Sequence, residues 1–251
     1  MSRKVPVPEL LIPILYNGAA MKIQGLQKMT LLDYPGRVAC TVFLGGCDFR
    51  CPFCHNFELV SGPMPTALDD DGLLAFLDTR HGLLDGVAIT GGEPCLRRDL
   101  PDLIGRIRAA GFPVKLDTNG NHPRMLERLL REGLVDYVAM DVKNSPAKYA
   151  RTIGLDDIDL TPIDESIRLL LEGSVDYEFR TTVVREFHEA SDFEEIGAWI
   201  AGAKRYFLQP YEERDTVPDR SLGAPDPASL RAFRDIAAGY VQMAAIRGAD
   251  D

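Results

Sequence analysis

Long hydrophobic runs and clusters of basic residues are missing from this sequence. No apolar run approaches the roughly 18 residues that a membrane-spanning helix needs, and the apolar stretch at residues 10–16 is interrupted by Pro13. No long run of Lys and Arg occurs either, and the formal net charge is −10. A negative field of this size repels phosphate backbones. We therefore expect neither a membrane protein nor a general nucleic-acid-binding protein.

Cysteine is also scarce, and its placement argues against a disulfide scaffold. The chain has five cysteines in 251 residues, whereas secreted disulfide-rich domains are shorter and richer in cysteine. Four of the five lie between positions 40 and 54, and Cys95 stands alone. This clustering fits reduced thiols that serve as ligands in the cytoplasm. Residues 10–16 could be taken for a weak signal peptide, but the closely spaced cysteines argue against export.

The length and composition indicate one domain with an N-terminal extension. With 45% hydrophobic residues, a chain of 251 residues can bury one large core. Residues 1–20 contain three prolines and show no helical period, whereas Met21 opens a segment that reads like a natural start. We expect residues 21–251 to form the domain and residues 1–20 to be an extension. The alternative is an ordinary terminal arm that packs on the domain.

Strand-like and helix-like segments alternate along the rest of the chain. RVACTVFL (37–44) is typical of a buried strand, and TALDDDGLLAFLDTR (66–80) of a helix capped by Thr66 or Asp69. The other predicted strands are 86–90, 113–120 with its turn, 134–143, 176–184 and 204–210, and the other predicted helices are 96–111, 122–133, 162–173, 191–203 and 226–247. Six βα units predict an α/β fold, with a parallel sheet closed or partly closed into a (βα)6 TIM-like barrel.

Polar motifs follow nearly every predicted strand. The cysteine segment follows the first strand, and the later motifs are GGEP (91–94), DTNG (117–120), DVK (141–143) and QPY (209–211). In α/β barrels the carboxyl ends of the strands hold the active site. An open doubly wound sheet binds ligands at the same ends, but only at its switch point. Motifs after almost every strand therefore favour the barrel.

The segment CDFRCPFC (47–54) carries the strongest chemical pattern, with Cys47, Cys51 and Cys54 spaced as C-x3-C-x2-C. Thiolates bind zinc or the iron of iron–sulfur clusters. A structural zinc site is closed by four protein ligands, whereas a four-iron cluster held by three cysteines leaves one iron open for catalysis. The two glycines before the motif and its aromatic residues suit a tight, water-shielded loop.

A fourth protein ligand has three candidates. Cys40 lies in the predicted strand 37–44, on the face of its apolar neighbours, and so is expected to be a core residue. His55 directly follows Cys54, and adjacent residues rarely converge on one small ion. Cys95 follows another strand and could approach in space. From the residues alone, zinc and an iron–sulfur cluster both stay open.

The cysteine motif resembles the hallmark of the radical S-adenosylmethionine (SAM) superfamily, in which an aromatic residue, here Phe53, precedes the last cysteine. GGEP alone could be an ordinary turn. Beside the cysteines it resembles the superfamily segment whose backbone and Glu carboxylate contact the methionine end of SAM. These residues are Gly91, Gly92, Glu93 and Pro94. Cys95 departs from the expected Thr or Ser and keeps the zinc alternative open.

The motifs after the third and fourth strands resemble those of activating enzymes for glycyl radical enzymes. By this resemblance, Asp117, Thr118 and Asp141 lie near the SAM carboxylate and an associated monovalent cation. Lys143 matches a lysine where substrate meets the cofactor, and Arg180 matches a strand arginine that can approach SAM. Without the resemblance, an Asx-type turn and a surface ion pair would be the simpler interpretations.

The segment from QGLQKMTLLDYPG to CTVFLGGCDFRCPFCHN is similar to the opening of the same activating enzymes, above all those of anaerobic ribonucleoside-triphosphate reductases. Asp33, in a DYPG turn, matches a family acid near the substrate glycine. The resemblance spans residues 21–211 and is strongest at 24–56 and 86–94.

The resemblance implies that Cys47, Cys51 and Cys54 hold a [4Fe-4S] cluster and that SAM binds the open iron. A low-potential donor such as flavodoxin or ferredoxin would supply an electron. Cleavage of SAM would give a 5′-deoxyadenosyl radical, which would take a hydrogen atom from a glycine of a partner enzyme. The implied partner is anaerobic ribonucleoside-triphosphate reductase.

Three alternatives stay open. They are an activator of the pyruvate formate-lyase type, a radical SAM enzyme acting on a small molecule, and a non-catalytic zinc or iron–sulfur module. Only about 30 residues without cysteine separate Cys54 from the next strand, which favours a single-cluster enzyme. His81, His122 and His188 lack ligand spacing and are expected at the surface.

Overall fold

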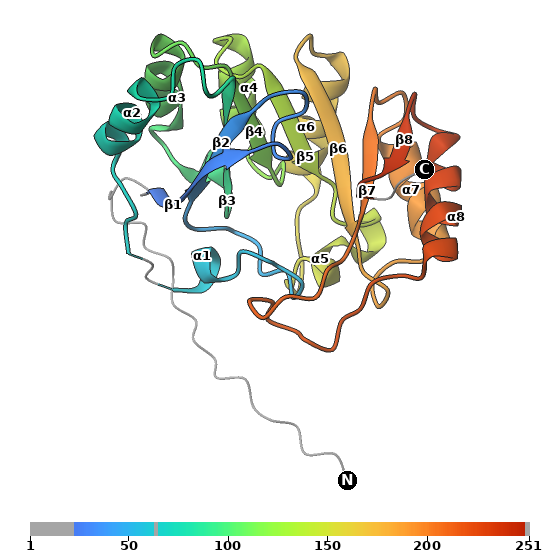
Figure 1. Ribbon diagram of the computed structural model, residues 1–251. Helices are drawn as coiled ribbons and strands as arrows, with labels where there is room; N and C mark the ends of the chain where they lie inside the picture. The colour runs from blue at the N-terminus through green and yellow to red at the C-terminus, as the bar shows by residue number, and fades with distance from the viewer. Residues whose placement is uncertain (1–22, 63–64, 249–251) are drawn as a thin grey trace.

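Eight strands form one sheet in the sequential order β1 to β8 in the computed structural model, which describes residues 23–62 and 65–248 (Figure 1). The strands are β1 (Ile23–Thr30), β2 (Ala39–Leu44), β3 (Gly86–Gly91), β4 (Val114–Thr118), β5 (Tyr137–Asp141), β6 (Asp176–Val183), β7 (Tyr206–Pro210) and β8 (Ala244–Ile246). β1 runs antiparallel to β2, and every later pair is parallel. No pairing joins β1 to β8 within the described ranges, so the sheet is a partial barrel.

Helices follow the parallel strands and cover one face of the sheet (Figure 1). They are α1 (Glu58–Ser61), α2 (Asp70–Asp78), α3 (Leu100–Ala109), α4 (Pro123–Arg131), α5 (Tyr149–Thr152), α6 (Thr161–Glu172), α7 (Ala190–Trp199) and α8 (Pro227–Ala238). Asp69 caps α2 by accepting a hydrogen bond from Gly72 N at 2.8 Å, which confirms one of the two predicted caps. No helix of the described residues is long and apolar enough to cross a membrane.

The structure differs from the predicted elements at both ends of the sheet. β1 was not predicted, because its sequence IQGLQKMT mixes glycine and polar residues and is not a β-branched run. The predicted helix 226–247 ends at Ala238, where Gly239 follows, and residues 244–246 form β8 beside β7 instead. The predicted extension, residues 1–20, lies outside the described residues.

Side chains alternate between the two faces of each strand, and this alternation separates the core from the site. Cys40, Val42 and Leu44 of β2 belong to the large hydrophobic core between the sheet and the helices, which confirms Cys40 as a core residue. Thr41 lies on the opposite, inner face. A small second cluster of Tyr34, Ala39, Tyr137 and Ala139 fills the inner face away from the strand carboxyl ends.

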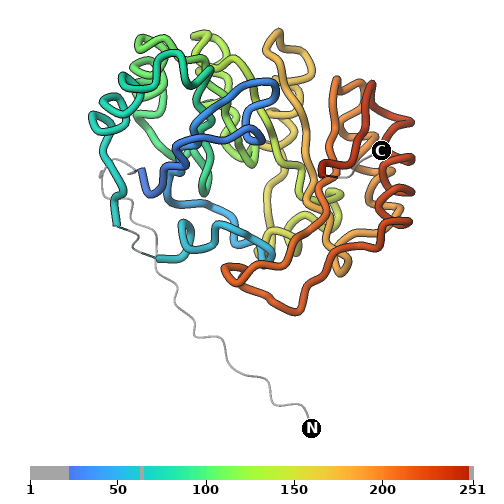
Figure 2. The backbone as a smooth tube through the Cα atoms, viewed as in Figure 1, coloured from blue at the N-terminus to red at the C-terminus, as the bar shows by residue number. Residues whose placement is uncertain are grey.

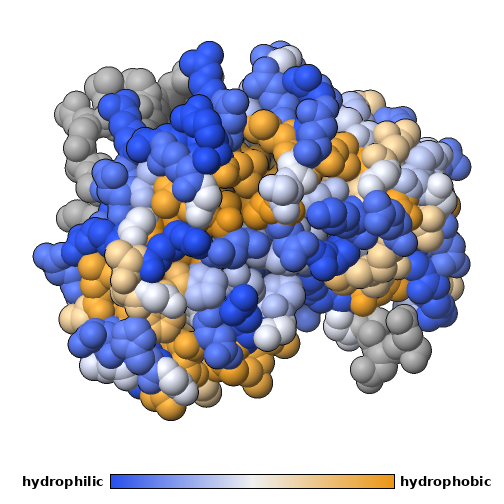
Figure 3. Space-filling model, turned by 90° about the horizontal axis from the view of Figure 1, so that it is seen from above, coloured by the Kyte–Doolittle hydropathy of each residue, from blue (hydrophilic) through white to orange (hydrophobic). Residues whose placement is uncertain are grey.

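The two ends of the barrel differ. The cysteine loop, α1, α5 and the segment after β7 gather at the carboxyl end of the parallel strands (Figure 2). The view from above looks onto the other end, where hydrophilic side chains surround hydrophobic residues (Figure 3). The polar motifs predicted from the sequence therefore meet at one end of the sheet.

Candidate active site

A cavity of about 410 Å³ lies between the cysteine loop and the carboxyl ends of the strands. Most of the predicted site residues line it, and they arrive from the β1–β2 turn, the cysteine loop and strands β3 to β6. Those that line it are Asp33, Cys47, Cys51, Phe53, Cys54, Gly91, Gly92, Asp117, Thr118, Asp141, Lys143 and Arg180. The topology thus brings together motifs that are up to 147 residues apart (180 − 33).

The cysteine loop is held against its neighbours by backbone hydrogen bonds. Gly46 N donates to Leu59 O at 2.7 Å, and Arg50 N donates to Ile153 O at 2.8 Å. The guanidinium of Arg50 also donates to Cys47 O at 2.6 Å. These contacts hold the backbone of the loop in place before any ligand binds.

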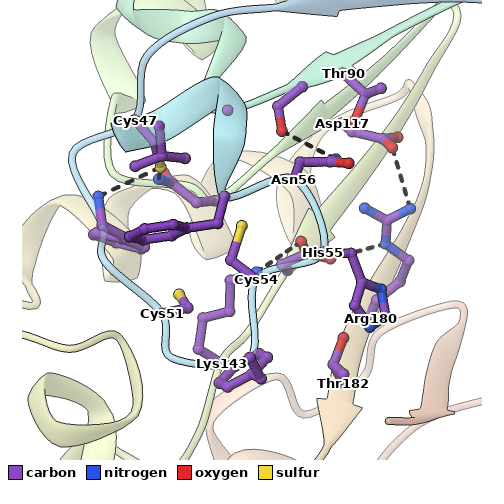
Figure 4. A pocket seen from close by; sticks show the side chains of 18 of the residues that line it. Cys47, Cys51, Cys54, His55, Asn56, Thr90, Asp117, Lys143, Arg180 and Thr182 are labelled. Atoms are coloured by element: carbon purple, nitrogen blue, oxygen red, sulfur yellow. Dashed lines mark hydrogen bonds and ion pairs between the residues drawn. The ribbon is translucent and has the colours of Figure 1, made fainter. Parts of the chain in front are cut away.

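The sulfur atoms of Cys47, Cys51 and Cys54 lie along one loop at the cavity wall (Figure 4). Neither Cys40 nor Cys95 lines this cavity. His55 lines the cavity, but its Nε2 lies 2.7 Å from Glu212 O and its ring stacks on Tyr211. No predicted fourth ligand therefore joins the three cysteines. The donor set fits a four-iron cluster with one open iron and does not fit a closed zinc site.

Burial raises the pKa of all three thiols. The pKa of Cys51 rises to about 12, and those of Cys47 and Cys54 also lie above their ordinary value for the same reason. The free thiols are consequently neutral at pH 7. Iron must displace these protons on binding, so we expect cluster assembly to release protons.

Gly91 and Gly92 permit a close approach between the end of β3 and the cysteine loop. A Cβ at Gly91, where φ is +123°, would lie 2.2 Å from Leu44 O. A Cβ at Gly92 would lie 1.9 Å from Gly46 O. Glu93 N then donates to Gly46 O at 2.8 Å. The glycine pair is therefore required sterically, whatever ligand occupies the cavity.

Glu93 is fully buried beneath the cavity wall. Its Oε1 accepts hydrogen bonds from Cys95 N at 2.9 Å and Thr118 Oγ1 at 2.8 Å, and its Oε2 accepts one from Asn119 N at 2.6 Å. Neither Glu93 nor Pro94 lines the cavity. In this structure the Glu93 carboxylate ties β3 to the end of β4, and its contact with SAM stays a prediction.

Acidic and basic groups alternate on the inner face of β4, β5 and β6. Arg180 donates through Nε to Asp141 Oδ1 at 2.9 Å and lies 3.4 Å from Asp117 Oδ2 (Figure 4). Lys143 Nζ donates to Asp141 Oδ2 at 2.9 Å, and Lys115 Nζ donates to Asp117 Oδ1. Asp141 and Lys143 share one face, as predicted. Lys115 was missed, although its spacing of two residues from Asp117 places it on the same face.

These basic neighbours set the charge of the two carboxyl groups. Burial alone would raise the pKa of Asp141, but Arg180 and Lys143 outweigh burial and hold it well below its usual range. The pKa of Asp117 is lowered in the same way by Arg180 and Lys115. Both carboxylates are therefore ionised at pH 7, and they hold the charged groups of Arg180 and Lys143 at the cavity.

Two of the three histidines that were expected at the surface lie elsewhere. His188 is buried, and it links the ends of two strands because Nε2 donates to Lys143 O at 3.0 Å and Nδ1 accepts from Val184 N at 3.1 Å. His122 is half-buried and contacts Asp48 of the cysteine loop. Neither position carries ligand spacing, so only the tertiary structure reveals these roles.

Asp33 reaches the cavity from the turn between β1 and β2. Its Oδ2 accepts a hydrogen bond from Thr41 Oγ1 at 2.5 Å, which orients the carboxylate. Three large hydrophobic side chains beside it are exposed: Met29, Leu31 and Leu32, at 64%, 71% and 86%. These three side chains form an apolar edge next to Asp33 in the sequence, at the amino end of β2, and none of them lines the cavity.

The chain matches known proteins in both sequence and fold. Residues 41–200 match the radical SAM superfamily. A candidate glycyl-radical enzyme activating enzyme of Methanocaldococcus jannaschii is 32% identical over 231 residues, which cover 90% of this chain and 95% of that protein. The pyruvate formate-lyase-activating enzyme of Listeria monocytogenes is 31% identical over 144 residues, covering 52% of this chain and 56% of that enzyme.

A solved structure shows the same fold. A domain of the pyruvate-formate lyase-activating enzyme from Bacteroides vulgatus aligns with a TM-score of 0.53 and 19% identity, over 65% of this chain and 99% of that domain. Members of the superfamily use a [4Fe-4S] cluster and SAM, and the three cysteines of the cavity fit that cluster. The chain belongs to the radical SAM superfamily and groups there with the activating enzymes of glycyl radical enzymes.

Proposed function

We propose that this protein generates the glycyl radical of a partner enzyme and that the partner is anaerobic ribonucleoside-triphosphate reductase. The observation that carries the proposal is the place of Asp33, which lies in the same cavity as the three cysteines. An acid in a DYPG turn is the feature that the sequence shares with activating enzymes rather than with radical SAM enzymes in general. The similarity to the Methanocaldococcus jannaschii protein over 90% of the chain supports the activation of a glycyl radical enzyme, whichever enzyme is the partner.

Some residues of the cavity would bind the cluster and SAM, and others would bind the substrate. When bound, the cluster and SAM supply one-electron cleavage of the sulfonium and a carbon radical that takes a hydrogen atom from the partner's glycine. Cys47, Cys51 and Cys54 would hold the cluster. Lys143 and Arg180 present positive charge to the cavity and would attract the carboxylate of SAM.

Asp33 would position the glycine segment of the partner. A carboxylate that is already oriented by Thr41 can accept hydrogen bonds from the backbone N–H groups of an extended peptide. Phe53, which is 4% exposed and packs on Phe187 with ring centroids 6.0 Å apart, helps to keep water from the reacting atoms.

The choice of partner follows from the amino-terminal part of the domain. Residues 24–56 resemble the opening of activators of anaerobic ribonucleoside-triphosphate reductase, and the short segment between Cys54 and β3 favours an enzyme with a single cluster. The second candidate is an activator of the pyruvate formate-lyase type, which the match to the Listeria enzyme favours. A reduced flavodoxin or ferredoxin would supply the electron, and the clustered thiols support a cytoplasmic location.

The test is anaerobic reconstitution with iron and sulfide, followed by dithionite and SAM. We expect 5′-deoxyadenosine by chromatography and, with the reductase present, a glycyl radical by electron paramagnetic resonance (EPR). Cys51→Ala should abolish both signals. Cys40→Ala is the matched control, because Cys40 is buried in the core and outside the cavity.

The possible outcomes distinguish an error in the identity of the partner from an error in the proposed chemistry. 5′-Deoxyadenosine without a radical on the reductase, but with a radical on pyruvate formate-lyase, would overturn the partner and keep the chemistry. A verified cluster that gives no 5′-deoxyadenosine and no spectral response to SAM would overturn the function itself.

A further inference from the structure

Lys115 is a lysine buried inside the barrel, one side-chain layer below the SAM pocket. It lies on the inner face of β4, between Ala88 of β3 and Tyr137 of β5. Its side chain is 2% exposed, and its ammonium group donates to Asp117 Oδ1. Lysine is rarely buried this deeply unless it is paired, so the ion pair with Asp117 accounts for its presence.

Every carboxylate oxygen of Asp117 and Asp141 has a basic partner. The Oδ1 and Oδ2 atoms of Asp117 face Lys115 and Arg180, and those of Asp141 face Arg180 and Lys143. The hydroxyl oxygen of Thr118 is a poor substitute as a cation ligand, because the hydroxyl already donates to Glu93 Oε1 and accepts from Gly120 N at 3.1 Å. Within the described ranges no three His, Cys, Asp or Glu side chains converge on one metal position.

The charges of this group of side chains disfavour a bound monovalent cation. Two carboxylates carry −2, and Lys115, Lys143 and Arg180 carry +3, so the cluster has a net charge of +1 (3 − 2). The carboxylate of SAM would bring the cluster to neutrality, whereas a further Na⁺ or K⁺ would add to the excess of positive charge. The residues therefore do not fit the cation site that the resemblance to activating enzymes implied.

We propose that the buried ammonium group of Lys115 is the fixed counter-ion of Asp117 and replaces a monovalent cation, so that SAM binding in this enzyme needs neither Na⁺ nor K⁺. The surroundings of Asp117 support this, because an ion at either oxygen atom of its carboxylate would lie beside the positive charge of Lys115 or Arg180 and be repelled by it. A tethered ammonium group also costs no loss of translational freedom when the site forms.

The experiment replaces Na⁺ and K⁺ by choline at constant ionic strength in the reconstituted full-length protein. The affinity for SAM and the thermal midpoint are measured at each cation concentration, and ²³Na relaxation reports Na⁺ binding without SAM. We expect no saturable cation effect on the parent protein. Lys115→Met should lose about 10-fold in SAM affinity in choline, which is about 1.4 kcal/mol, and regain it in K⁺.

Two further variants connect the effect to the ion pair. Combining Lys115→Met with Asp117→Asn should remove the acquired cation dependence, because the carboxylate that attracts the ion is gone. Lys204→Met is the control for the loss of one positive charge, since Lys204 is exposed and lies over the ring of Tyr177.

Saturable K⁺ or Na⁺ dependence of the parent protein would overturn the proposal. So would a folded Lys115→Met variant that binds SAM equally well in choline and K⁺. If this variant does not fold, the titration of the parent protein decides alone. The ²³Na result does not depend on which partner is activated, so failure of the activation assay would leave it unchanged.

Discussion

His122 donates from Nε2 to Asp48 Oδ2 over 3.0 Å and so connects the start of α4 to the cysteine loop. Asn119 Nδ2 donates to the other carboxylate oxygen of Asp48 at 2.8 Å, and Asn121 Nδ2 also donates to Oδ2. Asp48 follows Cys47 directly in the sequence. Three donors from one loop therefore hold the residue next to the first cluster cysteine.

Replacing Asp48 by Ala should make the position of Cys47 less well fixed. The change removes the common acceptor of three side-chain donors, and we expect the free energy of unfolding to fall by about 1–3 kcal/mol. The iron content after reconstitution should fall with it. Urea unfolding and iron analysis check both effects. Asp71→Ala is the control, because its ion pair with Arg106 is exposed and should contribute little. Unchanged iron content in Asp48→Ala would contradict the anchoring role.

Gly92→Ala should disrupt the contact between β3 and the cysteine loop. The new Cβ would lie 1.9 Å from Gly46 O, so one of the two backbones must move. We expect a loss of about 2–4 kcal/mol in the free energy of unfolding, together with a lower iron content. Gly105→Ala in α3 is the matched control, since a Cβ there meets nothing within 4 Å. That control should stabilise the protein by up to about 1 kcal/mol, and an equal effect of the two substitutions would contradict the steric argument.

Glu93→Gln distinguishes a structural carboxylate from a SAM ligand. All three partners of Glu93 are donors, so an amide group must leave at least one donor unpaired or facing another donor. We expect the protein without cluster and SAM to lose about 1–3 kcal/mol in urea unfolding. If the stability is unchanged and only the affinity for SAM falls, then the carboxylate acts on SAM and not on the fold.

The sequence predicted the site better than it predicted the edges of the sheet. Asp117 and Asp141 could be placed at the cavity because strand ends converge, whereas Arg180 was named only through the resemblance to activating enzymes. Its spacing of two residues from Asp117 could have identified Lys115, because side chains two residues apart on a strand share a face. β1 and β8 were missed because both are edge strands, whose pairing depends on β2 and β7 and not on a local apolar pattern.

The hydrogen-bond partners of the site could not be predicted from spacing. Glu93 was expected to face the ligand, and only the packing of β3 against β4 shows that its carboxylate accepts from Thr118 and Asn119. His188 was expected at the surface because it lies in a helical or loop segment and has no ligand spacing. Its burial depends on the carbonyl of Lys143, 45 residues away in the chain.

His188 should make the stability depend on pH. Burial lowers its pKa in the folded protein, whereas the unfolded chain titrates near pH 6.5. Below about pH 6.5 the unfolded state therefore binds more protons, and the free energy of unfolding falls as the pH decreases, by at most about 1.4 kcal/mol per pH unit. His188→Gln should remove this part of the slope between pH 7.5 and 5.5, whereas exposed His81→Gln should not. Equal slopes in parent and His188→Gln would contradict the lowered pKa, because the histidine would then bind protons alike in the folded and unfolded states.

Leu32→Asp should separate SAM cleavage from activation of the partner. Leu32 is 86% exposed beside Asp33, so the change should leave folding and uncoupled formation of 5′-deoxyadenosine unaltered. If the partner's glycine segment enters beside Asp33, a new charge on this apolar edge must be desolvated in the complex, and we expect the yield of glycyl radical to fall about 10-fold or more. Leu83→Asp is the matched control for a new charge on an exposed leucine, since Leu83 is 62% exposed and lies outside the segment 29–33. An equal radical yield from Leu32→Asp and the parent would place the partner on another face, because a docked protein could not tolerate that charge without cost.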